Sequence, residues 1–274
     1  MKKWGIFIII LSMYVSISCG NSNEEQDDNL FLISTQYGNI TIKLYDDTPE
    51  HKKNFQKLVD EDFYDGLLFH RVIPGFMIQG GDPDSRDAQP GDKLGGGSLD
   101  YTIPAEISEK HYHKHGAVAA ARRGGPSNPE KRSSATQFYI VQGRIFTDGQ
   151  LDTMEIVKNN QLKNELMRAQ FVAAEEQLQQ YRLNNDEAGF NLKIARIREQ
   201  ADSLFEADNL AFKFTPDQRD VYTTFGGYPS LDGDYSVFGE VVEGMDVVEK
   251  ITSEETDGND RPLENIDMKI KKID

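Results

Sequence analysis

A run of apolar and polar residues at positions 69–82 carries the side chains best suited to chemistry in this chain, and it reads FHRVIPGFMIQGGD. Counted with the two-residue period of an extended strand, Arg71 and Gln79 fall on the same side, and a Pro-Gly pair between them allows a bend. Phe76 and Met77 add an apolar surface beside the guanidinium and the amide. This combination favours binding of a neutral peptide over binding of a phosphate or a metal ion.

The segments that must position this run predict a mainly β fold. Residues 30–35 and 38–44 have strand character around a turn, and Thr48 with Pro49 begins a helix with an apolar face. Further extended segments occur at residues 101–104, 116–121, 136–141, 235–241 and 268–273, and a second short helix is predicted at 246–251. Many short strands with two short helices indicate a closed antiparallel barrel.

Residues 146–224 interrupt this strand pattern. Apolar residues recur there at helical spacing on both sides of a break at 186–189, which predicts an α-helical hairpin, and Pro216 begins a short third helix. The apolar stripes are explained by the two helices packing on each other, with a partner surface as the alternative.

The first 29 residues have the composition of an export signal followed by a tether. Lys2 and Lys3 precede an apolar stretch, which ends in small residues around Cys19 and is too short to span a bilayer comfortably. The layout resembles a bacterial lipoprotein signal at 1–18, cleaved before Cys19, which then carries lipid. An ordinary cleaved signal and an uncleaved anchor are the alternatives. Residues 19–29 are acidic and polar, as expected of a flexible tether.

Composition restricts the remaining function classes. The formal net charge of −16 argues against nucleic-acid binding, and a single cysteine cannot form an internal disulfide framework or a multi-cysteine metal site. His111, His113 and His115 would share one face of a strand and could bind zinc. Nothing nearby suggests a fourth ligand, so we expect no metal. We also expect a monomer.

Four ordered segments resemble cyclophilins, a class of peptidyl-prolyl cis-trans isomerases. Besides the run at 69–82, they are GAVAAAR at 116–122, SATQFYI at 134–140, and LDG through VFG at 231–239. The resemblance implies an eight-stranded antiparallel closed barrel capped by two helices. It places this isomerase domain at 30–145 and 225–274, with the helical insertion at 146–224. It also implies rotation about the bond preceding proline, without a cofactor.

The resemblance assigns roles to individual residues. Arg71 matches the catalytic arginine, Gln79 a polar group beside the substrate backbone, and His70 the histidine that precedes the arginine. The other matched positions form the substrate-binding set: Phe76, Met77, Ala121, Arg122, Gln137, Tyr139, Leu231 and Tyr235. Because the insertion joins the chain between the matched Tyr139 and Leu231, we expect it to lie beside or over the substrate groove.

Three positions depart from the family pattern. Tyr139 replaces the usual phenylalanine, Tyr235 stands where many members have histidine, and Ser230 stands where cyclosporin-sensitive members carry tryptophan. Weak cyclosporin affinity is therefore expected. Because the arginine is retained, activity on proline peptides is still expected.

Together these features predict an isomerase that assists folding of exported proteins in the bacterial cell envelope. Its expected partners are proline-containing segments of unfolded or exported proteins, and a membrane reached through lipidated Cys19. The periplasmic face of a membrane is the expected location, with the cell surface as the alternative. The competing hypothesis is a proline-segment binding module or holdase chaperone with little isomerase activity.

Overall fold

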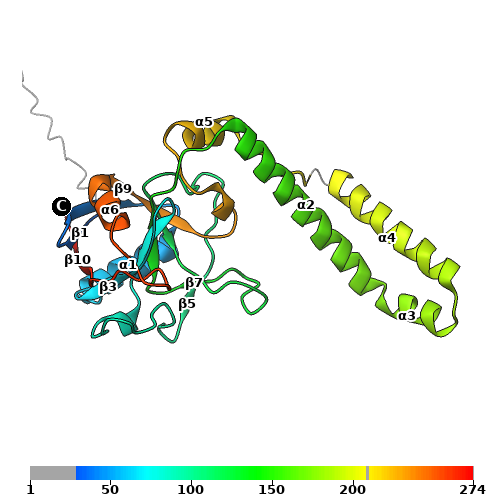
Figure 1. Cartoon of the computed structure of the whole chain (residues 1–274), viewed down its shortest axis with the longest axis horizontal. Helices are drawn as coiled ribbons and strands as arrows, with labels where there is room; N and C mark the ends of the chain where they lie inside the picture. Colours follow the sequence, from blue (N-terminus) through cyan, green and yellow to red (C-terminus); the bar gives the residue numbers. More distant parts are fainter. Residues whose placement is uncertain (1–28, 208–209, 274) are drawn as a thin grey trace, which may run out of the picture.

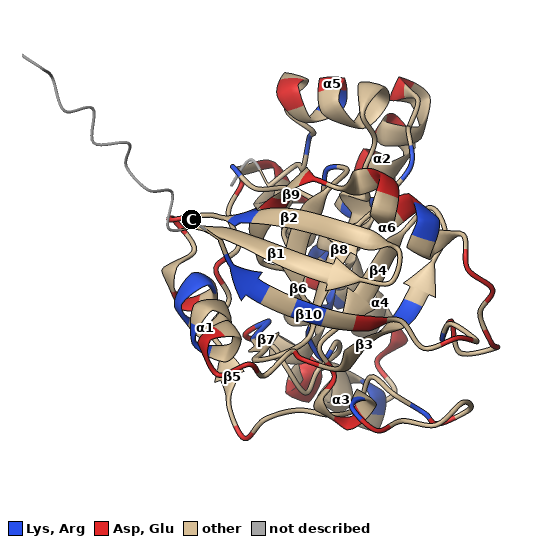
Figure 2. Cartoon of the chain, turned by 90° about the vertical axis from the view of Figure 1, so that its left-hand side faces the viewer, with Lys and Arg blue, Asp and Glu red and all other residues tan. Residues whose placement is uncertain are grey.

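The computed structural model describes residues 29–207 and 210–273, and eight of their strands close into an antiparallel barrel (Figures 1 and 2). The strands follow one another around the barrel in the order β1-β10-β3-β4-β8-β6-β9-β2. Their bounds are β1 Leu30–Thr35, β2 Gly38–Leu44, β3 Leu67–Ile73, β4 Met77–Gly80, β6 Ala117–Ala120, β8 Phe138–Val141, β9 Val237–Glu243 and β10 Asp267–Lys272. The predicted closed barrel is confirmed.

Alternation of side chains explains why these segments enclose a core. In β1, Phe31 and Ile33 are fully buried, and in β10 the alternate residues Met268 and Ile270 are buried as well. These residues belong to one large apolar cluster inside the barrel, together with Phe138 on β8. Two short strands, β5 (Thr102–Ile103) and β7 (Ser133–Ser134), pair outside the barrel.

Two helices complete this core. Helix α1 (Pro49–Asp60) has proline in its first turn and buries Phe55 and Leu58 in the barrel cluster. Helix α6 (Met245–Thr252) buries Val248 and Ile251 in the same cluster. Both helices were expected from the sequence, and their apolar faces pack on the barrel.

The insertion forms an arm rather than a compact cover. Its helices are α2 Asp148–Ala173, α3 Glu175–Leu183, α4 Glu187–Ala207 and α5 Pro216–Thr224. Figure 1 shows α2 and α4 side by side and projecting away from the barrel, with α3 at the far end and α5 at the base. Capping boxes at Thr147 and Thr215 begin α2 and α5. The predicted hairpin is present, although its first limb is divided at Ala174.

The arm does not lie over the substrate groove, so of the two expected positions, beside the groove or over it, the second is wrong. Of the residues that line the two pockets described below, none comes from 146–224. The root of the arm, formed by α5 and the first part of α2, approaches the site: the Lys158 ammonium on α2 donates a hydrogen bond to the Asp232 carbonyl oxygen at 2.7 Å. The root is itself held by a small apolar cluster of Phe146, Leu151, Phe214 and Tyr222.

Among the residues that the structure describes, no helix combines the length and the apolar character needed to cross a membrane. The described residues also include two short 3₁₀ turns, at Pro83–Ser85 and Pro229–Leu231.

Candidate functional site

Strand register places the central site residues in one row across the barrel surface. Arg71 on β3 is paired with Gln79 on β4, Gln79 with Tyr139 on β8, and Tyr139 with Ala119 on β6. Paired residues on neighbouring strands point to the same face of a sheet. Arg71 and Gln79, whose spacing predicted that they share a side, therefore belong to one row of side chains that crosses four strands.

An apolar pocket of about 160 Å³ opens on this row. Met77 and Tyr139 are almost fully buried, and Leu231, from the turn at 229–231, also lines the pocket. The full lining is Arg71, Phe76, Met77, Gln79, Ala121, Arg122, Tyr139, Leu231 and Tyr235. We call this the apolar pocket.

The turn between β3 and β4 aims Phe76 at the apolar pocket. The Phe76 amide donates to the Ile73 carbonyl at 3.0 Å, and Gly75 has a φ of 71°, which a side chain would strain. The Gln142 side chain accepts from the Gly75 amide at 2.6 Å and fixes the turn. The Phe76 ring also lies 4.1 Å, centroid to centroid, from the ring of Tyr228, which supports this wall.

A chain of polar side chains forms the edge of the apolar pocket. The Arg71 guanidinium lies 3.4 Å from the Gln79 carbonyl oxygen, and the Gln79 amide donates to Gln137 at 3.0 Å. The Arg71 side chain remains 41% exposed, with its Nε 3.5 Å from the Asp260 carboxylate. Arg71 therefore keeps donors available for a ligand in the pocket, since guanidinium carries five N–H groups.

Gln137 is fixed in turn by a glycine loop and a buried carboxylate. Its amide donates to the carbonyls of Gly95 and Gly97 at 3.3 and 2.9 Å. The fully buried Asp82 carboxylate accepts from the amides of Gly95, Gly97 and Asp84. A side chain at position 97 would collide with the Asp82 and Asp84 carboxylates. Asp82, the last residue of the run at 69–82, thus holds the glycine loop whose carbonyls fix the Gln137 side chain.

A buried hydrogen-bonded chain links the floor of the apolar pocket to the arm. The Tyr139 hydroxyl lies 3.0 Å from His113 Nε2, and His113 Nδ1 lies 2.9 Å from Asp232. The other oxygen of the Asp232 carboxylate accepts from the Tyr222 hydroxyl of α5 at 2.6 Å. His113 is 1% exposed and Asp232 is 6% exposed. Burial raises the pKa of Tyr139 well above its ordinary value, so the phenol stays neutral.

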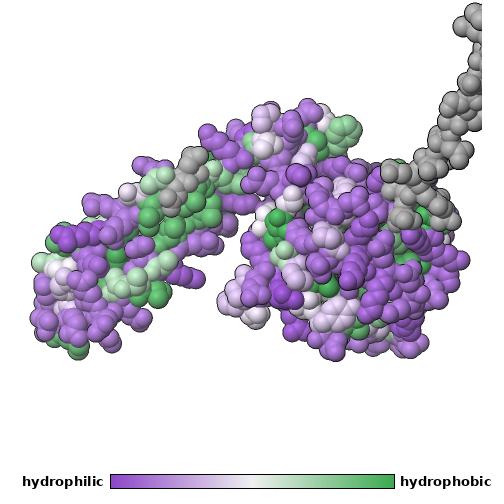
Figure 3. Space-filling model, turned by 180° about the vertical axis from the view of Figure 1, so that it is seen from behind, coloured by the Kyte–Doolittle hydropathy of each residue, from purple (hydrophilic) through white to green (hydrophobic). Residues whose placement is uncertain are grey.

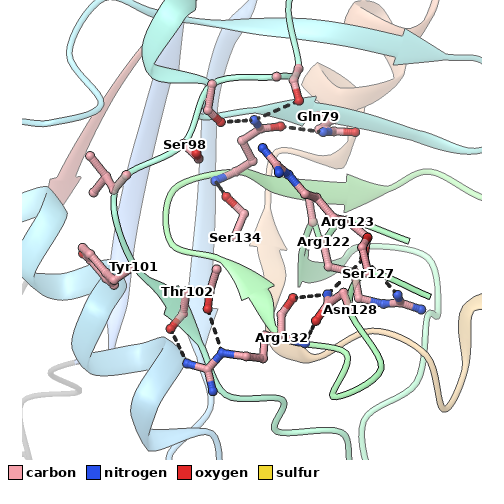
Figure 4. A pocket seen from close by; sticks show the side chains of 16 residues that line it. Gln79, Ser98, Tyr101, Thr102, Arg122, Arg123, Ser127, Asn128, Arg132 and Ser134 are labelled. Carbon is pink, nitrogen blue, oxygen red and sulfur yellow. Dashed lines mark hydrogen bonds between the residues drawn. The ribbon is translucent and has the colours of Figure 1, made fainter. Parts of the chain in front are cut away.

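A second, larger pocket of about 430 Å³ adjoins the first and shares Gln79, Ala121 and Arg122 with it. Figure 4 shows Arg122 and Arg123 on the side opposite Ser98 and Tyr101. Arg132 also lines this space. We call it the arginine pocket.

The structure brings most of the predicted residues together. Apart from His70 and Gln137, every predicted catalytic or substrate-binding residue lines the apolar pocket, and Gln137 lines the arginine pocket. His70 lies elsewhere: it is 3% exposed on β3, behind the pocket row, and lines neither pocket. Burial lowers its pKa to about 4, so it is neutral near pH 7. Cys19 lies outside the described residues.

The three alternating histidines have separate partners. His111 Nε2 contacts Asp47, His113 contacts Tyr139 and Asp232, and His115 contacts the Gln142 carbonyl. Within residues 29–207 and 210–273 no group of three or more His, Cys, Asp or Glu side chains is arranged to hold a metal ion.

Several residues that build the site were missed by sequence reasoning. Asp82 and Asp232 lie within the segments 69–82 and 231–239, but the sequence of these segments does not show which groups the two carboxylates bind. The sequence distinguishes His113 only as the middle member of three alternating histidines. Asp260 and Tyr222 lie far from the site in sequence, and only the folded chain brings them to Arg71 and Asp232.

Comparison with known proteins gives a clear family match. The model of the family "cyclophilin type peptidyl-prolyl cis-trans isomerase/CLD" matches residues 30–163 and 217–273. A protein of Staphylococcus haemolyticus, provisionally named a peptidyl-prolyl cis-trans isomerase, is 28% identical over 92% of this chain and 94% of its own length.

Two further relatives differ in how much of them is matched. A Staphylococcus aureus protein with the same provisional name is 27% identical over 93% of this chain and 95% of its own length. A Streptococcus pyogenes protein, provisionally named a bifunctional phosphatase/peptidyl-prolyl cis-trans isomerase, is 29% identical over 85% of this chain. The chain spans 36% of that streptococcal protein.

Among solved structures, a cyclophilin-type isomerase of Cryptosporidium parvum aligns with a TM-score of 0.48 and 19% identity, covering 89% of this chain and 97% of the other.

Proposed function

The chain belongs to the cyclophilin-type peptidyl-prolyl cis-trans isomerases, and we propose that it isomerises X-Pro bonds in exported proteins at the bacterial cell envelope. The isomerase activity follows from the family and from the relatives that share it. The location rests on the sequence alone: the signal-like residues 1–18, Cys19 and the acidic tether. Lipidated Cys19 would hold the enzyme at a membrane surface.

The reaction needs no bond to be made or broken. Amide resonance keeps the prolyl bond planar, and its barrier of about 20 kcal/mol makes uncatalysed rotation take tens of seconds or more. A catalyst needs to bind the twisted amide more tightly than either planar form. In the twisted amide the proline nitrogen becomes pyramidal and can accept a hydrogen bond.

The site offers both parts of such a catalyst. The apolar pocket formed by Phe76, Met77 and Leu231 can hold the proline ring and exclude water. Arg71 stands at its edge with donors available for the twisted amide, and a donor in a water-poor site acts more strongly than in water. This position of Arg71, with its guanidinium held by Gln79, is the observation that carries the proposal.

The catalytic part is tested with the chain from residue 20 onward and a capped Ala-Pro peptide. Exchange between the cis and trans forms is measured by NMR exchange spectroscopy, without a coupled protease. We expect exchange to accelerate in proportion to enzyme concentration. Exchange at the uncatalysed rate would leave only the binding-module hypothesis.

The envelope part is tested in bacterial cells that express the full chain. We expect a radioactive fatty acid to be incorporated into the wild-type protein but not into a Cys19→Ala variant, and the wild-type protein to fractionate with membranes. Wild-type protein without label in the cytosolic fraction would refute this part and leave the catalytic part intact.

One observation favours a holdase role as a second candidate. The arm exposes large apolar side chains, among them Val172 (67%), Leu183 (71%) and Leu192 (54%). Figure 3 shows hydrophobic residues gathered along the arm. A surface of this kind can hold unfolded chains through apolar contacts.

Substitution on the arm separates the two roles. The triple variant Val172→Ser, Leu183→Ser, Leu192→Ser removes exposed apolar side chains and should leave the fold intact. If the arm is a holdase surface, the variant loses protection of an aggregating client protein but keeps peptide isomerisation. Unchanged protection would exclude this surface. An Arg168→Gln variant on α2 serves as a control for mutation of the arm.

A further inference from the structure

The arginine pocket differs in charge from the rest of the molecule. The chain has 46 acidic and 30 basic residues, yet the described residues that line this pocket include three arginines and no carboxylate. In a chain with net charge −16, such a concentration of cations in one concave site favours an anionic ligand.

The three guanidinium groups differ in how far they are neutralised. Arg122 Nε donates to the Asp234 carbonyl at 2.6 Å, and its Nη2 lies 3.7 Å from the Asp234 carboxylate, which Lys131 also contacts at 2.8 Å. The Arg122 guanidinium stacks on the Tyr235 ring at 4.5 Å. Because the single Asp234 carboxylate contacts two cations, it neutralises the positive charge of neither completely.

Arg132 and Arg123 are less compensated. Arg132 is fixed by two hydrogen bonds to Thr102, of 2.7 and 2.8 Å, while its nearest carboxylate, Glu130, is 3.9 Å away with its side chain 75% exposed. The exposed Arg123 guanidinium forms no hydrogen bond or ion pair with any residue that the structure describes. The three arginines and Lys131 carry more positive charge than the Asp234 and Glu130 carboxylates neutralise, so the site has an excess of positive charge.

The arginine pocket is continuous with the apolar pocket. Gln79, Ala121 and Arg122 line both spaces, so a polypeptide seated in one extends into the other. An extended chain advances about 3.3 Å per residue, which brings a residue close in sequence to the proline into the arginine pocket. The volume of about 430 Å³ accommodates one acidic side chain with water.

We infer that the arginine pocket binds the carboxylate of an Asp or Glu side chain near the isomerised proline and so selects acidic client segments. This inference rests on the proposed function and adds the class of segment that the enzyme prefers. Arg123 is the principal specificity residue because its charge is uncompensated, and Arg132 is a fixed second donor.

The test uses capped peptides with a central Ala-Pro pair and a single variable residue. Glu, its uncharged isostere Gln, or Lys is placed at each of the three positions on either side of the pair. For at least one position, we expect kcat/KM to be about 3- to 10-fold higher for Glu than for Gln, as for a partly exposed ion pair. Lys at that position should be disfavoured. The preference should shrink in 0.5 M salt.

Two variants assign the preference to the arginine pocket. Arg123→Gln should lower the Glu-to-Gln ratio towards one, and Arg123→Glu should invert the preference towards Lys. Arg168→Gln removes an equal charge from the exposed surface of α2 and should leave the ratio unchanged. An equal change of the ratio in Arg123→Gln and Arg168→Gln would point to the global field of the protein and would refute the inference.

Binding of the same peptides by calorimetry separates failure of this inference from failure of the proposed function. If no peptide is isomerised but Glu peptides bind more tightly than Gln peptides, the inference stands and the catalytic proposal fails. If all peptides are isomerised with equal kcat/KM and bound equally, the inference is overturned and the catalytic proposal stands.

Discussion

At the scale of residues, Tyr139 shows how a departure from the family pattern is accommodated. The hydroxyl that it adds lies in a buried position, where an unpaired polar group would be costly. His113 supplies the partner, and Asp232 fixes the histidine on its other side. The ring thus keeps an apolar face towards the pocket while its hydroxyl is directed to the buried chain.

Replacing Tyr139 with Phe tests this arrangement. The change leaves the ring but deprives His113 Nε2 of its partner, so we expect a loss of about 1 to 2 kcal/mol in the free energy of unfolding. Peptide isomerisation should change little. Urea denaturation measures the loss, and Tyr235→Phe is the matched control at a partly exposed tyrosine of the same pocket. Equal stability of wild type and Tyr139→Phe would show that this hydrogen bond is unimportant.

At the scale of elements, the arm is joined to the site through α5. The Tyr222 hydroxyl donates a hydrogen bond to Asp232, which directly follows Leu231 in the wall of the apolar pocket. Lys158 on α2 holds the carbonyl of the same aspartate. The root of the arm therefore positions one pocket wall, whereas its distal helices α3 and α4 line neither pocket.

A Tyr222→Phe variant should consequently impair catalysis from a distance. Loss of the bond to Asp232 loosens the Leu231 wall, and we expect kcat/KM to fall about threefold or more, chiefly through a higher KM. Tyr181→Phe on α3 is the control, because among the described residues the partner of its hydroxyl is Gln177 of its own helix. A fall of the same size in both variants would argue against a specific role for Tyr222.

At the scale of the whole molecule, local patterns predicted the barrel and the pairing of Arg71 with Gln79, whereas most of the apolar pocket was predicted through the resemblance to cyclophilins. Two-residue periodicity determines which face of each strand is buried, and Arg71 and Gln79 face each other as their spacing predicts. The direction of the arm depends on contacts between distant segments, and periodicity carries no information on it. Periodicity likewise gives no information on the contact between Asp260 and Arg71, which are far apart in the sequence.

The free energy of unfolding of the whole fold is expected to depend on pH, because His70 is buried in the folded protein. Unfolded His70 takes up a proton near its ordinary pKa of about 6.5, whereas folded His70 does so only near 4 because it is buried. The unfolded state therefore binds more protons in this window, and stability falls as the pH drops. From pH 7 to 5 we expect a loss of about 2 kcal/mol from this residue.

Urea midpoints at both pH values measure this loss, and an NMR titration of the His70 ring checks its cause. A His70 ring that titrates near pH 6.5 in the folded protein would contradict the account.

Arg71 at the edge of the apolar pocket is expected to stabilise the twisted prolyl amide. NMR exchange spectroscopy of a capped Ala-Pro peptide with wild type, Arg71→Ala and the surface control Arg168→Ala measures this stabilisation. Because the Arg71 side chain is 41% exposed, its removal should leave the unfolding transition nearly unchanged. We predict that Arg71→Ala lowers kcat/KM by about 100-fold, as for loss of one transition-state donor, and that the control does not. An Arg71→Ala protein that isomerises the peptide as fast as wild type would contradict the account.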